Sequence, residues 1–195
     1  SLSWEHILAP LAESGHRCFA PNLPGYGESE RPDIAYTVPF YIDFVGSLMD
    51  ALELERPSLV GLSMGGAISL GSTLERPQRT HKLVLAAPYG IQRKVAMHFI
   101  SWLSVQTPGL MELTWALTRR SRAMLNWMTR ALFHDPKRIP PALIEKVYAE
   151  TQKPHAGRAF TRFQRDEVRM RSLRTVYLER LGEISAPTLD RKSVV

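Results

Sequence analysis

The sequence GLSMG at residues 61–65 is the most informative stretch of this chain of 195 residues. A short apolar run, PSLV at residues 57–60, comes before it, and a run rich in small residues, GAISLG at residues 66–71, comes after it. This order predicts a strand, a sharp turn and a helix, with Ser63 at the tip of the turn. We expect glycines beside the serine because side chains there would collide with the backbone of the strand and the helix.

A serine on such a turn suits nucleophilic catalysis. Its hydroxyl would be exposed, and the next residue, Met64, would present its backbone N–H at a helix N-terminus, where developing negative charge is stabilised. We therefore predict that Ser63 is a catalytic nucleophile and that Met64 donates to the oxyanion. The alternative is a glycine-rich turn without a chemical role.

A second motif, PNLPGYGES at residues 21–29, follows the apolar residues 18–20. With this motif and the turn at Ser63, the chain resembles the α/β-hydrolase superfamily, whose members carry a D-x-x-G-x-G-x-S loop upstream of a nucleophile elbow. Asn22 stands where the family usually has aspartate. The resemblance extends from about residue 3 to about residue 189 and is strongest between residues 18 and 88.

The expected fold is an incomplete α/β-hydrolase fold. Apolar runs predict strands at residues 17–20, 58–62 and 82–87, and helical spacing predicts helices at residues 4–14, 36–54 and from Ser63 to about residue 76. Strands that alternate with helices indicate a mostly parallel sheet flanked by helices. Residues 184–189 resemble the entry to a further strand of the family.

The sequence pattern predicts helices throughout residues 91–182, with breaks near residues 108–109, 135–136 and 140–141. The resemblance implies that this segment is a cap inserted over an active site. We expect a first core part at residues 1–90, a helical cap at residues 91–182 and the start of the remaining core at residues 183–195. The cap's Trp and Met side chains either form its core or line an apolar substrate pocket.

The resemblance also implies groups that this sequence does not supply. In the family an acid and then a histidine follow the serine, and here only residues 190–195 follow the last expected strand. Asp190 is a weak candidate for the acid. The sequence contains six histidines, all before that point: His6, His16, His81, His98, His134 and His155.

The family's His-Gly loop, which supplies a second oxyanion N–H, and the strand before it would precede residue 4. We therefore expect a hydrolase truncated at both ends. The strands at residues 17–20 and 58–62 would then lie about 10 Å apart, two strand spacings, or close up and pair directly.

Composition narrows the class of protein. No apolar run reaches the roughly 18–20 residues that span a bilayer, and the opening residues lack a secretory signal pattern, so we expect a cytoplasmic protein. We expect the single cysteine, Cys18, to be buried and inert.

The charge is unevenly distributed along the chain. Residues 92–180 carry 17 Lys and Arg against 7 Asp and Glu, within a net charge of +6 for the whole chain. This imbalance indicates solvated helix faces or attraction to an anionic substrate or membrane surface.

The resemblance implies a hydrolase that acts on a small ester or other acyl substrate, apolar in character, through Ser63. A serine at this position argues against the epoxide hydrolases and haloalkane dehalogenases of the superfamily, which use aspartate. Esterases, lipases, carbon–carbon bond hydrolases and proline aminopeptidases remain. No cofactor, metal site or nucleic-acid partner is implied, and no oligomeric state is favoured. The alternative is a non-catalytic fragment or binding protein that retains only the elbow.

Overall fold

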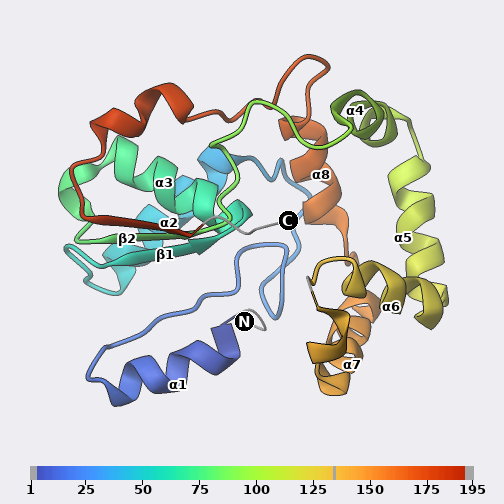
Figure 1. The fold of residues 1–195 in the computed structure, drawn as a ribbon, viewed down its shortest axis with the longest axis horizontal. Coiled ribbons are helices and arrows are strands. Elements are labelled where there is room, and N and C mark those ends of the chain that lie inside the picture. The colour runs from blue at the N-terminus through green and yellow to red at the C-terminus, as the bar shows by residue number, and fades with distance from the viewer. Residues whose placement is uncertain (1–3, 134, 192–195) are drawn as a thin grey trace. The chain divides into compact units, whose positions relative to one another are not determined.

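A computed structural model describes residues 4–133 and 135–191 of the protein (Figure 1). These residues form two compact units. The sheet unit comprises residues 35–108 and 162–191, and the helical unit comprises residues 4–34 and 109–161. The division into core and cap at residues 1–90, 91–182 and 183–195 stays a prediction.

The sheet unit is built on three parallel strands in the order β1-β2-β3. β1 (Leu59–Leu62) pairs with β2 (Leu83–Ala86), and β2 pairs with β3 (Thr188–Arg191). The register places Leu62 opposite Ala86 and Ala86 opposite Arg191, so the three strands end at the same edge. The parallel sheet, β1 and β2 confirm the prediction from the apolar runs, and β3 lies where the resemblance implied that a further strand begins.

The helices of the sheet unit follow the predicted pattern closely before residue 92. Thr37 begins α2, because its hydroxyl accepts a hydrogen bond from the Phe40 N–H at 3.2 Å. α3 begins directly after Ser63 and ends before Pro77. The helical elements of this unit are α2 (Val38–Ala51), α3 (Met64–Glu75), η2 (Pro77–Arg79), α4 (His98–Gln106), most of α8 (Arg158–Glu167) and η4 (Leu178–Glu183).

The core of the sheet unit lies where α3 packs against β2. Leu70 and Leu83 are fully buried, and Leu74 and Leu85 complete the cluster. Each fully buried leucine contributes about 1.5–3 kcal/mol relative to an exposed one. This core fixes β2 beneath α3 and therefore fixes the turn at Ser63 that leads into α3.

The helical unit consists of short helices separated by turns. Its elements are α1 (Glu5–Glu13), α5 (Leu110–Arg120), α6 (Arg122–Arg130), η3 (Pro136–Arg138), α7 (Pro141–Gln152) and the first residues of α8. Gly109, with a φ of 77°, precedes α5, and Pro141 is the first residue of α7. The predicted breaks at residues 108–109 and 140–141 are therefore confirmed.

Two predictions of secondary structure are wrong. Residues 16–23 contain no strand, and two parts of the segment predicted as helices throughout, residues 91–97 and 168–177, contain no helix. A strand exists only where a neighbouring strand accepts and donates its hydrogen bonds, and no described strand pairs with residues 17–20. Cys18 is accordingly half-buried instead of buried. Residues 168–173 form a tight turn instead, closed by an antiparallel bridge between Val168 and Leu173.

Among the described residues, no helix is both long enough and apolar enough to cross a membrane.

Candidate active site

Ser63 occupies the turn between β1 and α3, as the sequence predicts. Its backbone has a φ of 51° and a ψ of −116°, and its side chain is exposed. A non-glycine residue in such a conformation costs about 1–3 kcal/mol, and it persists only where the surroundings hold it. The strain indicates that the position of Ser63 is imposed by its neighbours.

Four hydrogen bonds hold the backbone of Ser63. Its N–H donates to the Ala86 carbonyl at the end of β2, at 3.1 Å. Its carbonyl accepts from the N–H groups of Gly66 at 2.9 Å, Ala67 at 3.2 Å and Tyr89 at 3.0 Å. Both the helix and the segment after β2 therefore fix the serine, while its hydroxyl stays outside the backbone network.

The glycines around Ser63 have different roles. A Cβ on Gly61 would lie 2.7 Å from the Gly66 Cα, and a Cβ on Gly66 would lie 2.7 Å from the Pro88 Cβ. A Cβ on Gly65 would meet nothing within 4 Å. The expected collision is therefore confirmed at Gly61 but wrong at Gly65. The crowded position on the helical side is Gly66, because the segment after β2 packs against it.

Met64 is the first residue of α3, as expected for the residue after the nucleophile. Its backbone N–H belongs to the first turn of the helix, where the helix dipole favours negative charge. Its role in stabilising an oxyanion stays a prediction.

The segment after β2 contributes a residue that the sequence reasoning missed. Tyr89 donates its N–H to Ser63, and its ring packs edge-on against Phe163 of α8, with centroids 5.6 Å apart. Burial and the nearby Glu167 carboxylate raise the pKa of Tyr89 above its ordinary value. A Pro-Tyr-Gly sequence directly after a buried strand could have drawn attention to this loop, but nothing in the sequence distinguishes Glu167 from surface carboxylates.

Among the described residues, no hydrogen bond joins Ser63 to either histidine of the sheet unit. His81 precedes β2, whereas Ser63 follows β1, so the strand register separates them by about 20 Å along the sheet. His98 lies at the start of α4, with its Nε2 2.9 Å from the Arg169 carbonyl oxygen.

No role at Ser63 is assigned to the remaining candidates for the base and the acid. His6, His16 and His155 belong to the helical unit, and His134 lies outside the described residues. Asp190 lies within β3, opposite Leu85, instead of in a loop after the strand.

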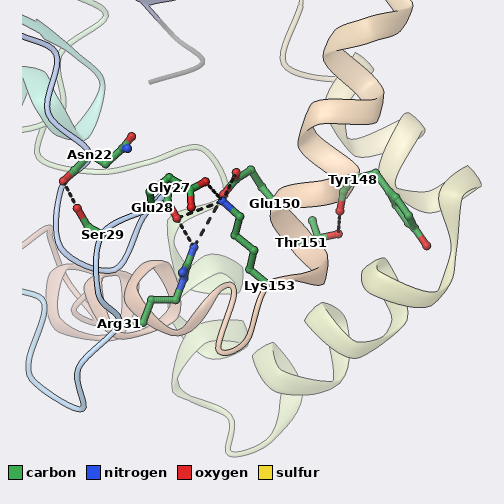
Figure 2. A network of polar contacts seen from close by, with 9 residues as sticks. All are labelled: Asn22, Gly27, Glu28, Ser29, Arg31, Tyr148, Glu150, Thr151 and Lys153. Atoms are coloured by element: carbon green, nitrogen blue, oxygen red, sulfur yellow. Dashed lines mark hydrogen bonds and ion pairs between the residues drawn. The ribbon is translucent and has the colours of Figure 1, made fainter.

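The second motif folds into a compact turn within the helical unit (Figure 2). The Ser29 hydroxyl donates to the Asn22 carbonyl at 2.6 Å. The Asn22 side chain fills the space that a Cβ on Gly27 would occupy, and Gly27 has a φ of 55°. The asparagine therefore packs within the turn in place of the family's aspartate.

Charged side chains tie this turn to the end of α7 (Figure 2). The Gly27 carbonyl accepts from Arg31 at 2.7 Å and from Lys153 at 3.3 Å. Lys153 also pairs with Glu28 and Glu150. Hydrogen bonds to both carboxylates raise the pKa of Lys153, and the pKa of Glu28 is lowered by Lys153. The turn and α7 therefore form one polar network inside the helical unit.

The fold and the turn at Ser63 define the class of protein. A family model described as the alpha/beta hydrolase fold matches residues 1–170, so the chain belongs to this family. The recognition of the family from residues 21–29 and 61–65 is thereby confirmed, as is the partial α/β fold.

Curated relatives match part of the chain, and two of them illustrate the range of activities. The chain is 39% identical over 90 residues to 2-hydroxymuconate semialdehyde hydrolase from Pseudomonas sp. (strain CF600). The aligned segment covers 46% of this chain and 31% of the relative. The chain is also 39% identical over 101 residues to Epoxide hydrolase 3 from Siraitia grosvenorii. That aligned segment covers 50% of this chain and 32% of the relative. The matched segments thus span about a third of each relative's length.

A solved structure resembles the chain over nearly its whole length. The meta-cleavage product hydrolase from Pseudomonas fluorescens IP01 aligns with a TM-score of 0.71 at 21% identity, and the alignment covers 96% of this chain and 64% of that one. This likeness shows the shared fold.

Proposed function

We propose that this chain carries the nucleophile site of a serine hydrolase that acts on an ester or other acyl substrate. Ser63 Oγ attacks the carbonyl carbon, its proton passes to a general base, and the Met64 N–H stabilises the resulting oxyanion. The tetrahedral intermediate then collapses, and the bond to the leaving group breaks as the base returns the proton to it. Water hydrolyses the resulting acyl-enzyme, which releases the acid and restores the serine hydroxyl. The observation that carries the proposal is the exposed Ser63 at a strained turn between β1 and α3, held by four backbone hydrogen bonds.

The relatives support a carbonyl compound as the substrate. One relative is named as the hydrolase of a semialdehyde, which contains a carbonyl group. The epoxide hydrolase among the relatives shows that the family also includes enzymes named for another bond. A serine at position 63 favours the carbonyl reaction, because an acyl-serine is readily hydrolysed. An apolar substrate, the cap role of residues 91–182 and a cytoplasmic location stay predictions.

Hydrolysis of a short-chain p-nitrophenyl ester tests the proposal. We expect Ser63→Ala to abolish turnover, whereas Ser69→Ala should leave it unchanged. Ser69 is a matched control because it lies on α3 and its contact with Thr73 uses the backbone carbonyl, which alanine retains. Equal rates for the wild type and Ser63→Ala would remove the serine from the mechanism.

The second candidate function is non-catalytic binding by a protein that retains the elbow. The placement of His81 at the far end of the sheet and of His98 on the Arg169 carbonyl favours this candidate. Removing the base of a triad typically costs several orders of magnitude in rate. A folded chain that hydrolyses no ester and shows no difference between the wild type and Ser63→Ala would support this candidate.

A further inference from the structure

One face of α4 exposes large apolar side chains. Phe99 and Ile100 each lie one helical turn before Leu103, so the three form one stripe, with exposed fractions of 61%, 53% and 50%. Met97, directly before α4, is 70% exposed, and the Phe99 ring packs against Trp102 with centroids 5.5 Å apart. Single exposed apolar residues are ordinary, but a contiguous group of large ones marks an interaction site.

The other face of α4 is fixed to the end of α8 and to the turn that follows it (Figure 1). Val105 is buried on that face, and its carbonyl accepts from the Arg165 Nε–H at 3.0 Å. The Gln106 side chain donates to the Arg165 carbonyl at 3.1 Å, and the His98 Nε2 lies 2.9 Å from the Arg169 carbonyl oxygen. These contacts hold α4 in place, so its apolar stripe stays on the outside of the sheet unit.

Basic side chains lie on the two segments that border this stripe. The Leu173 N–H donates to the Arg93 carbonyl at 2.8 Å, which joins the turn after α8 to the segment before α4. The turn also adds Met170, which is 50% exposed, to the apolar group. The exposed basic residues of the two segments are Arg93, Lys94, Arg169, Arg171 and Arg174. We call these residues, with Met97, Phe99, Ile100, Leu103 and Met170, the α4 surface; all of them belong to the sheet unit.

Positive charge exceeds negative charge in this part of the molecule. Residues 92–106 and 165–179 together contain six Lys and Arg against three Asp and Glu, a balance of +3. The fold already engages the three acidic side chains: Asp166 pairs with Arg169 and Arg174, Glu179 pairs with Arg93, and the buried Glu167 accepts from Thr175. Lys94 and Arg171 are exposed, and neither forms an ion pair within the part of the chain that the structure describes.

The arrangement of apolar and basic groups indicates the kind of partner. An apolar stripe with a positive border is complementary to a surface that is negative outside and apolar beneath. A bilayer that contains anionic lipids has this structure, because charged headgroups lie above the acyl chains. A second copy of the chain would bring the same positive border, and like charges would oppose its docking.

We propose that the α4 surface docks on a bilayer that contains anionic lipids. Phe99, Ile100 and Leu103 enter the boundary between headgroups and acyl chains, while Lys94 and Arg171 bind the headgroups. So few side chains give reversible binding to the surface and not a permanent anchor. The inference does not depend on the proposed function, because membrane binding is measured without catalysis.

Sedimentation of the purified chain with lipid vesicles tests the proposal. We compare vesicles of phosphatidylcholine alone with vesicles that also contain phosphatidylserine. The chain should sediment with the mixed vesicles, and binding should weaken as the salt concentration rises, because salt screens the charges. Binding to neither kind of vesicle, or equal binding to both, would overturn the proposal.

Matched variants locate the binding to the α4 surface. Lys94→Gln and Arg171→Gln should each lower the partition coefficient about fivefold, the contribution of one basic side chain near an anionic membrane. Lys82→Gln is the control, because Lys82 is an exposed lysine that precedes β2 and lies outside the α4 surface. It should leave the partition coefficient unchanged. An equal loss in Lys82→Gln would show attraction to the whole charge of the chain and would overturn the proposed surface.

The apolar stripe is tested in the same way. Leu103→Ser should lower the partition coefficient about tenfold, because serine removes apolar area that the bilayer would bury. The matched control is Leu189→Ser, since Leu189 is an exposed leucine of β3, and it should change nothing. Sedimentation velocity without lipid gives the remaining outcome. A wild-type dimer that Leu103→Ser converts to a monomer would identify the stripe as an interface between copies and would overturn membrane docking.

Discussion

Replacing Gly66 by alanine should destabilise the sheet unit, whereas the same change at the adjacent Gly65 should not. A Cβ on Gly66 would lie 2.7 Å from the Pro88 Cβ and 2.8 Å from its Cα. Pro88 cannot move away easily, because the next residue donates to Ser63 at 3.0 Å. Overpacking lowers the free energy of unfolding by about 1–3 kcal/mol. Alanine favours the helix over glycine by up to about 1 kcal/mol, which offsets part of this loss. We therefore expect the free energy of unfolding to fall by about 1–2 kcal/mol.

Urea unfolding at equilibrium measures this difference. With a slope of about 2 kcal/mol per M, Gly66→Ala should lower the midpoint by about 0.5–1 M at an unchanged slope. Gly65→Ala meets nothing within 4 Å and should leave the midpoint unchanged or raise it. A Gly66→Ala protein that is as stable as Gly65→Ala would refute the packing of the elbow against Pro88.

Three further predictions concern the core and the charged groups. Leu83→Ala removes a fully buried side chain of β2 and should cost about 2–5 kcal/mol in a urea titration, and a loss below about 1 kcal/mol would contradict the described core. Burial and Glu75 raise the pKa of Tyr177 to about 12. The folded state therefore holds this proton more tightly than the unfolded state, and stability should fall between about pH 10 and about pH 12. Tyr177→Phe should weaken this fall in stability. A pH profile of stability that is identical in the variant and the wild type would contradict the raised pKa of Tyr177. Lys153 lowers the pKa of the Glu28 carboxyl in the folded state. The pairing of Glu28 with Lys153 therefore stabilises the fold at pH values above the ordinary carboxyl pKa of about 4.3. This stabilisation is lost as the pH falls through the pKa of Glu28 in the folded state. The difference in urea midpoint between the wild type and Glu28→Gln should thus vanish in acid, and a difference that persists there would contradict the pairing.

The sequence predicted the elements whose partners are close in the chain. β1, α3 and β2 follow one another between residues 59 and 86, and their apolar runs, the glycines and Pro77 mark their limits. The positions of Ser63 and Met64 follow from the same local pattern. Local propensity and packing agree here, which is why the pattern alone was sufficient.

Other features depend on contacts that sequence patterns do not reveal. Residues 17–20 have the composition of a strand, but a strand also requires a partner, and no described strand supplies one. Residues 168–177 have helical composition, yet the bridge between Val168 and Leu173 and the bonds from Thr175 to Glu167 fold them into a turn. The hydrogen bond from Tyr89 to Ser63 was missed for the same reason, because it joins residues that are distant in the chain.

The most direct test of the central claim is to treat the purified, folded chain with a fluorophosphonate and to map the adduct by mass spectrometry. We predict a single adduct on the peptide that contains Ser63, and we predict that Ser63→Ala loses it. A folded chain that carries no adduct, or one that carries it on another residue, would contradict the claim that Ser63 is an activated nucleophile.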